Sequence, residues 1–158
     1  MDKDKALREH VANLLRGGQT YQPIAKLLRG LKAEEAGRNI EGLPYTIWQQ
    51  LEHLRFALYD ILDFSRNPDY EEPTWPDDYW PKEKAPADQA ALDASLASIS
   101  QGVEEMIALV EDTQQDLYAA FPHGNGQTLL REAMLVAEHN AYHVGQVMVM
   151  RRILGNWE

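Results

Sequence analysis

The sequence of 158 residues contains no cysteine. This absence excludes disulfide bonds, thiolate metal ligands and a cysteine nucleophile. It also means that cysteine content gives no information about the cellular compartment of the protein. Any metal site in this chain must therefore be built from histidine, aspartate and glutamate.

Positive charge is also scarce, since 15 lysines and arginines face 25 aspartates and glutamates, for a formal net charge of −10. This balance disfavours nucleic acid and anionic membrane surfaces as partners, because both attract basic proteins. No apolar run approaches the roughly 20 residues that a membrane span needs. The N-terminal segment MDKDKALREH lacks the apolar stretch of a secretory signal, so we expect a cytoplasmic protein.

Apolar residues recur at helical spacing along most of the chain, and no stretch alternates as a strand does. The length suits one domain, residues 1–158. Caps, glycines and prolines mark the ends of the helices. We expect helices at about Asp2–Arg16, Pro23–Leu31, Thr46–Arg66, Pro86–Ala120 and Thr128–Leu154.

Four of these helices are long and amphipathic, which predicts an all-α fold in which their apolar stripes face inward as a four-helix bundle. The residues between the second and third long helices, 67–85, are rich in proline and in aromatic side chains such as Trp75, Tyr79 and Trp80. This composition suits neither a helix nor a disordered linker. We expect a long ordered loop that packs on the bundle, where it closes the core, walls a pocket or contacts a second copy.

The segment HNAYHVGQ, residues 139–146, places His139 and His143 four apart in the last helix. That spacing puts both imidazoles on one helix face, where their nitrogens can reach one metal ion. A pair of histidines that only bonds to backbone carbonyls is the simpler alternative. His53 in the second long helix, flanked by Leu51 and Leu54, favours the metal, because three histidines from two helices leave coordination positions open for water or substrate.

Three segments, WQQLEHL, HNAYHVGQ and RRILG, resemble the DinB/YfiT-like family of helical bundles, and the matching helices span essentially the whole chain. The resemblance implies a divalent metal, zinc or nickel, on His53, His139 and His143. It also implies a homodimer. Members of that family have been assigned as thiol transferases, thiol-dependent isomerases and hydrolases, so the resemblance leaves the reaction and the small-molecule substrate open.

Two chemistries suit such a site, and both need something besides the metal. A metal held by three histidines could activate water for hydrolysis, or bind a low-molecular-weight thiol that attacks an electrophile. The second route needs a thiol cofactor, because the chain has no cysteine of its own. Asn140 stands where an HExxH helix carries its glutamate, so the zinc protease mechanism lacks its base.

Other polar residues are secondary candidates. Glu132 and Asp60 each lie two turns from a predicted ligand, about 10 Å along a helix, so we expect them to support a ligand indirectly or to have structural roles. Gln146 suits a hydrogen bond to His143 that orients this ligand, a contact to substrate, or a hydrogen bond between helices. We expect Glu52 and Glu138 on solvated helix faces.

Two further histidines are weaker candidates. His10 has the spacing of the first helix's apolar stripe and is the first choice for a fourth ligand or an acid-base group, although a polar residue at the stripe's edge is the simpler interpretation. His123 precedes the last helix and suits a loop-capping role, with contact to a pocket as the alternative. The alternative to an enzyme is a non-catalytic bundle that serves as a structural or protein-interaction module, which predicts a closed metal site or none.

Overall fold

The computed structural model describes residues 2–20 and 22–157. These residues form six α-helices and no strand, with one isolated bridge between Ala120 and Thr128. The all-α class is confirmed. The helices are α1 (Lys3–Arg16), α2 (Ile24–Leu27), α3 (Ala33–Ala36), α4 (Ile47–Arg66), α5 (Gln89–Glu111) and α6 (Leu129–Ile153).

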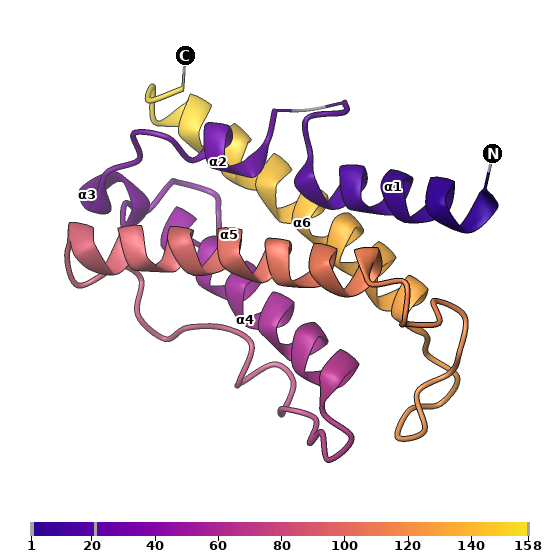
Figure 1. Cartoon of the computed structure of the whole chain (residues 1–158). Coiled ribbons are helices and arrows are strands. Elements are labelled where there is room, and N and C mark those ends of the chain that lie inside the picture. Colours follow the sequence, from indigo (N-terminus) through magenta and orange to yellow (C-terminus); the bar gives the residue numbers. More distant parts are fainter. Residues whose placement is uncertain (1, 21, 158) are drawn as a thin grey trace.

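The four long helices, α1, α4, α5 and α6, form the predicted bundle (Figure 1). α4 packs against both α5 and α6, while α1 packs against the same two helices from the other side. The short helices lie in the connection between α1 and α4, where α2 contacts α5 and α6, and α3 contacts α4. α4 and α6 therefore face each other directly, and these are the two helices that carry the predicted histidines.

Side-chain caps begin the long helices as their sequences indicate. Thr46 caps α4, accepting from the Gln49 backbone N–H at 3.2 Å, while the Gln49 side chain accepts from the Thr46 N–H at 3.2 Å. Thr128 caps α6 in the same way through the N–H of Arg131. These bonds satisfy backbone donors that a helix start leaves free, so both helices begin at a defined residue.

The apolar core consists of two clusters stacked along the bundle axis. One cluster holds the N-terminal half of α6 and the C-terminal halves of α4 and α5, together with α1. The other holds the opposite halves of the same helices, together with α2 and α3. On α4, Leu51 and Leu54 on either side of His53 belong to the second cluster, and Leu58, one turn further on, belongs to the first. The predicted histidines therefore lie at the level where the two clusters meet.

The third long helix is shorter than the predicted Pro86–Ala120. α5 begins at Gln89 because the Asp88 side chain accepts from the Ala91 N–H, and Pro86 lies before the helix. It ends at Glu111, where the Asp112 and Asp116 side chains accept from the N–H groups two residues further on. Such local bonds compete with helix formation, which explains the early end.

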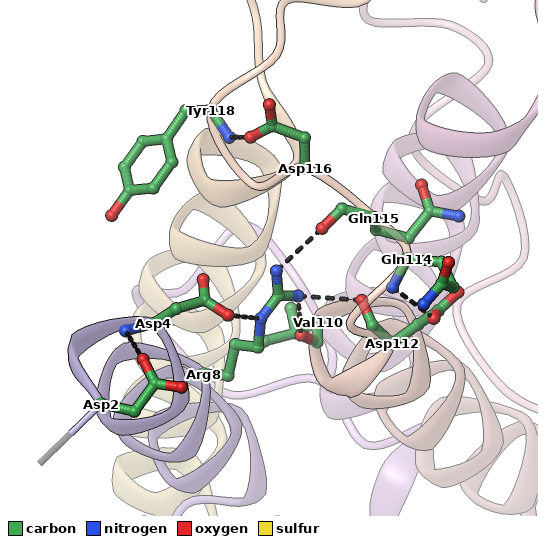
Figure 2. Close-up of polar contacts among 9 residues, drawn as sticks. All are labelled: Asp2, Asp4, Arg8, Val110, Asp112, Gln114, Gln115, Asp116 and Tyr118. Carbon is green, nitrogen blue, oxygen red and sulfur yellow. Dashed lines mark hydrogen bonds and ion pairs between the residues drawn. The ribbon is translucent and has the colours of Figure 1, made fainter.

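A buried arginine from another helix binds the segment after α5 (Figure 2). Arg8 of α1 donates to the carbonyl oxygens of Val110, Asp112 and Gln115 at 2.7, 2.9 and 2.8 Å. A helix end leaves carbonyl oxygens without a partner from a following turn, and Arg8 supplies donors to those of Val110 and Gln115, while the Asp112 carbonyl also accepts from the Gln115 N–H at 3.1 Å. Tertiary contacts of this kind are invisible in the local sequence of α5.

The predicted helix Pro23–Leu31 is also shorter in the structure. α2 covers only Ile24–Leu27, and a second short helix, α3, which we did not predict, follows at Ala33–Ala36. Gly30 between them has a φ of 71°. This left-handed backbone interrupts the helix, since glycine adopts it without steric cost.

Residues 67–88, here called the strap, connect α4 to α5 and run back along α4 (Figure 1). The Thr46 hydroxyl donates to the Lys84 carbonyl at 2.7 Å, and the Gln49 amide donates to the Pro81 carbonyl at 3.3 Å. The strap is therefore the predicted ordered loop, held against α4 by hydrogen bonds to its own backbone. Within the described part of the chain, no helix combines the length and apolar character that crossing a membrane requires.

Candidate metal centre

The structure brings together the three histidines that the sequence singled out. Ring nitrogens of His53, His139 and His143 all lie within 4.8 Å of one another. The Nε2 atoms of His53 and His139 are 3.2 Å apart. His53 and His143 are 4% and 5% exposed, so the group lies between α4 and α6 rather than on the surface.

The hydrogen bonds of two rings determine which nitrogen is free. His53 Nδ1 lies 2.9 Å from the Tyr79 carbonyl oxygen, and His143 Nδ1 lies 2.6 Å from Oε1 of Gln50. Both oxygens can only accept, so each Nδ1 carries the proton and donates it. The Nε2 atoms of both rings therefore keep their lone pairs, as a metal ligand must.

His139 completes the group from α6. Its Nε2 atom faces His53, while its Nδ1 atom is buried and has no hydrogen-bond partner among the described residues. A buried polar atom without a partner costs free energy and is uncommon. Here it belongs to a ring whose other nitrogen points at a second imidazole, an arrangement that a shared cation would stabilise.

Burial keeps the three imidazoles neutral near pH 7. Desolvation lowers the pKa of His53, although the bond to the Tyr79 carbonyl opposes this. Desolvation and the neighbouring rings lower the pKa of His139 to about 4 and that of His143 to about 3. Neutral imidazoles bind metal ions without first releasing a proton, so little protonation competes with binding at neutral pH.

Aromatic side chains wall the site. The Trp80 ring stacks on His53 with centroids 4.0 Å apart and an interplanar angle of 2°, and Tyr45 stacks on Trp80 with centroids 4.2 Å apart. Trp75 approaches His53 edge-on at 6.3 Å and is 67% exposed. Of the roles we considered for the aromatic loop, the structure supports that of a wall beside the histidines.

The donor set suits a divalent metal with open coordination positions. Neutral imidazoles are common ligands of divalent transition metals, and two of the three rings have their second nitrogen bonded to a carbonyl oxygen, as metal-bound histidines usually do. Among the described residues, no fourth histidine or carboxylate joins the group. Asn140, which stands at the HExxH glutamate position, is 2% exposed and has no side-chain partner among the described residues.

The two carboxylates two turns away do not reach the histidine group. Asp60 accepts from the hydroxyls of Tyr70 and Tyr79 at 2.8 and 2.7 Å. Glu132 is 2% exposed and accepts from Arg131 at 2.8 and 3.0 Å, and burial raises its pKa even though Arg131 opposes that shift. Both line a separate polar cavity of about 440 Å³. Their placement agrees with the expectation that neither acts directly at the metal.

The remaining histidines also lie outside the group. His10 is exposed on α1, so the structure does not place it as a fourth ligand. His123 Nε2 lies 2.8 Å from the Phe64 carbonyl, which bonds the loop before α6 to the end of α4. This contact agrees with the expected loop-capping role.

The two glutamates beside the ligands differ from each other. Glu138 is exposed, as expected. The expectation for Glu52 was wrong, because this carboxylate is half-buried and pairs with Arg55 and Ser95. Although desolvation opposes the shift, these partners leave the pKa of Glu52 lowered. The correction reflects the packing of α5 against this face of α4, which the sequence of α4 does not reveal.

Sequence reasoning missed two groups that orient the rings. Gln50 accepts from His143 and donates its amide to Gln146 Oε1 at 3.0 Å, so Gln146 makes a hydrogen bond between helices and reaches His143 only through Gln50. Gln50 lies three residues before His53, a spacing that places both on one face of α4 and could have indicated it. The Tyr79 carbonyl had no comparable signal, because it depends on the path of the strap.

The fold and the histidine group together define a class of protein, a helical bundle with a candidate three-histidine metal site between two of its helices. The sequence model of the DinB superfamily matches residues 18–147, which include all three histidines. The chain belongs to the DinB superfamily. Comparisons with curated proteins and with solved structures found no match.

Proposed function

We propose that this protein binds one divalent metal ion, zinc or nickel, through His53, His139 and His143 and uses it to transform a small molecule. The observation that carries the proposal is the arrangement of the rings, in which hydrogen bonds to the Tyr79 carbonyl and to Gln50 leave two Nε2 lone pairs free within one group. A bound divalent ion would supply Lewis acidity, which activates either water or a thiol.

The chain's own residues would orient the ligands and limit access of water. Gln50 and the Tyr79 carbonyl hold the rings of His143 and His53, and Trp80 covers one face of His53. Because no fourth protein ligand joins the group within the described residues, positions remain for a substrate. A purely structural site would be closed by four protein ligands, so this feature favours an enzyme.

A cavity beside the site has the size for a small molecule. It has a volume of about 340 Å³ and is lined mainly by apolar side chains, with the amides of Gln50 and Gln146 among them. Gln50 thus contacts the cavity and His143 at once. Small-molecule sites commonly combine an apolar lining with a few polar groups in this way.

Two reaction types follow, a hydrolysis and a thiol transfer. Hydrolysis needs a general base, and the structure places neither Asp60 nor Glu132 in the histidine group. Thiol transfer needs a low-molecular-weight thiol, since the chain has no cysteine. Here the thiol would lose its proton to solvent, and its sulfur would form a bond to an electrophilic carbon while the leaving group departs with the bonding electrons. The lack of an assigned base makes thiol transfer the first reaction to assay.

The test is elemental analysis of untagged protein, with wild type compared with His143→Ala and His123→Ala. We expect about one zinc or nickel per chain in wild type, its loss in His143→Ala and its retention in His123→Ala. The last variant is the matched control, because His123 lies outside the group. Metal should also raise the thermal unfolding temperature of wild type, since a ligand that binds only the folded state stabilises it.

The contrary outcome is wild type without metal and without a thermal shift at micromolar zinc or nickel. It would favour the alternative of a non-catalytic bundle that serves as a structural or protein-interaction module. If metal binds, assays with thiol and electrophile pairs and with ester or amide substrates separate transferase from hydrolase activity.

We further propose that the protein is a homodimer. Exposed apolar side chains on α6, among them Tyr142 at 65% and Val149 at 50%, support a protein contact on this helix. Both residues also line the cavity of about 340 Å³, so the partner would cover the open side of that cavity. Sedimentation equilibrium should give twice the mass of one chain. We expect Tyr142→Lys to yield monomers. Tyr118 is equally exposed but lies outside α6, so Tyr118→Lys should leave the dimer intact.

A further inference from the structure

We propose that Asp60 is a positioning residue for the metal centre, which it affects by holding the strap so that Tyr79 and Trp80 fix the imidazole of His53. The inference rests on the proposed function, because it assigns the role of Asp60 through a proposed ligand. Its structural part, the control of the His53 ring, can be measured without metal.

Asp60 contacts the strap at two points. Its Oδ1 accepts from the Tyr70 hydroxyl at 2.8 Å and its Oδ2 from the Tyr79 hydroxyl at 2.7 Å. Both carboxylate oxygens are thus engaged by the same connecting segment. Hydrogen bonds to a carboxylate are shorter and stronger than those between neutral groups, so this contact is stronger than an ordinary loop bond.

Tyr79 joins Asp60 to His53 through its two ends. Its hydroxyl bonds Asp60, while its backbone carbonyl accepts from His53 Nδ1 at 2.9 Å. Asp60 and His53 are seven residues apart on α4, or about 10 Å along one face of the helix. The side chain of one tyrosine spans this interval, so a shift at Asp60 moves the acceptor that determines the His53 tautomer.

The next residue of the strap acts on the same ring. Trp80 stacks on His53 with centroids 4.0 Å apart, so two consecutive strap residues set the ring's tautomer and its plane. Further along the strap, the carbonyls of Pro81 and Lys84 accept from α4 side chains. Asp60 holds the strap on one side of Tyr79, and these two bonds hold it on the other.

This arrangement also assigns the Tyr79 hydroxyl a structural purpose. Desolvation and the bond to Asp60 raise the pKa of the phenol, so it stays protonated and donates across the ordinary pH range. Asp60 is therefore an acceptor for two phenols rather than a base for substrate. The metal centre's geometry would depend on a carboxylate that never touches the metal, because groups that orient metal ligands commonly affect the metal without contacting it.

The test compares wild type with Asp60→Ala, Asp60→Asn, Tyr79→Phe and the control Tyr59→Phe. Tyr79→Phe removes only the hydroxyl and keeps the ring against Phe56. Tyr59 lies on α4, beside Asp60 in the sequence, and its hydroxyl donates to the Ser98 carbonyl of α5 at 3.1 Å. It therefore controls for the loss of a phenol bond that does not involve the strap.

Two readouts apply to each variant. Long-range ¹H–¹⁵N NMR of the metal-free protein reports the His53 tautomer, and absorption spectra of added cobalt(II) report affinity and coordination. We expect wild type and Tyr59→Phe to hold the Nδ1–H tautomer. Asp60→Ala and Tyr79→Phe should show a mixture of tautomers and roughly 10-fold to 100-fold weaker cobalt binding, with Asp60→Asn between them and wild type.

The outcomes separate this inference from the proposed function. Unchanged tautomer in Asp60→Ala and Tyr79→Phe, or unchanged cobalt affinity where wild type binds cobalt, would overturn it and mean that the Thr46 and Gln49 contacts suffice. If wild type binds no metal, the proposed function fails. The tautomer alone then decides whether Asp60 positions His53.

Discussion

Gln50 Oε1 and His143 Nδ1 lie 2.6 Å apart, in a hydrogen bond that joins α4 to α6 inside the candidate metal centre. Gln50 is 2% exposed, so water cannot readily replace it. We predict that Gln50→Leu weakens zinc binding by about 10-fold to 100-fold, because His143 would lose the acceptor that keeps its Nε2 lone pair free. Isothermal titration with zinc measures this effect.

Gln146→Leu is the matched control for that variant. It removes the amide that Gln50 contacts at 3.0 Å and leaves the Gln50–His143 bond in place. We expect its zinc affinity to stay within about threefold of wild type. Equal losses in the two variants would instead indicate that general packing between the helices matters, and not the acceptor on His143.

The stability of the metal-free protein should depend on pH through the buried histidines. Burial and the neighbouring rings lower the pKa of His139 to about 4 and of His143 to about 3, whereas unfolded histidines titrate near pH 6.5. As the pH falls below about 6.5, these histidines become protonated in the unfolded chain but stay neutral in the folded chain. The free energy of unfolding should then decrease by up to about 2 kcal/mol per ring between pH 6.5 and 5.

Urea titrations at pH 7 and pH 5 in the presence of a chelator measure that decrease. His143→Gln should lose the part of it that this ring contributes, while His53 and His139 keep theirs. His10→Gln, which replaces an exposed histidine, should keep all of it. A wild type equally stable at both pH values would contradict the lowered pKa of these rings.

The sequence predicted most of the bundle because its main signals are local. Thr46 and Thr128 cap their helices through N–H groups three residues on, and the His139 and His143 spacing places both rings on one face whatever the tertiary fold. The prediction that His53 lies close to these two rings followed from the expected bundle. It required no knowledge of how α4 and α6 pack in detail.

Most of the features that were missed depend on contacts between distant segments. Local aspartate bonds help to end α5 before Asp112, but Arg8 of α1 also binds there, and Glu52 is paired because Ser95 of α5 packs beside it. The Tyr79 carbonyl that orients His53 is a backbone atom, and every residue but proline offers the same pair of backbone groups. No pattern of residue types could have singled it out.

Arg8 should contribute strongly to stability. Its guanidinium donates to three carbonyl oxygens, one in the last turn of α5 and two just beyond it, and to the Asp4 carboxylate at 2.7 Å, and the residue is 6% exposed (Figure 2). We predict that Arg8→Lys lowers the free energy of unfolding by about 2 to 4 kcal/mol, because an ammonium cannot reproduce this fork of donors. Chemical denaturation measures the change.

Arg16→Lys provides the comparison for Arg8. Arg16 pairs with Glu111 at 2.9 Å near the same end of α5, but both side chains are about half exposed. Exposed ion pairs contribute little, so we expect a change below about 0.5 kcal/mol. Similar decreases in the free energy of unfolding in both variants would mean that burial of the Arg8 guanidinium adds nothing to its contribution to stability.

Two glycines within helices should respond in opposite directions to alanine. A Cβ at Gly102 of α5 would lie 2.8 Å from Leu58 Cδ2, whereas a Cβ at Gly145 of α6 would meet no atom within 4 Å. Leu58 is 1% exposed and has little room to move, so Gly102→Ala should lower the free energy of unfolding by about 1 to 3 kcal/mol. Gly145→Ala should raise it by about 0.5 to 1 kcal/mol through helix propensity alone. Urea denaturation of both variants measures the pair, and a stabilised Gly102→Ala would show that α4 and α5 pack less closely at Leu58 than the structure indicates.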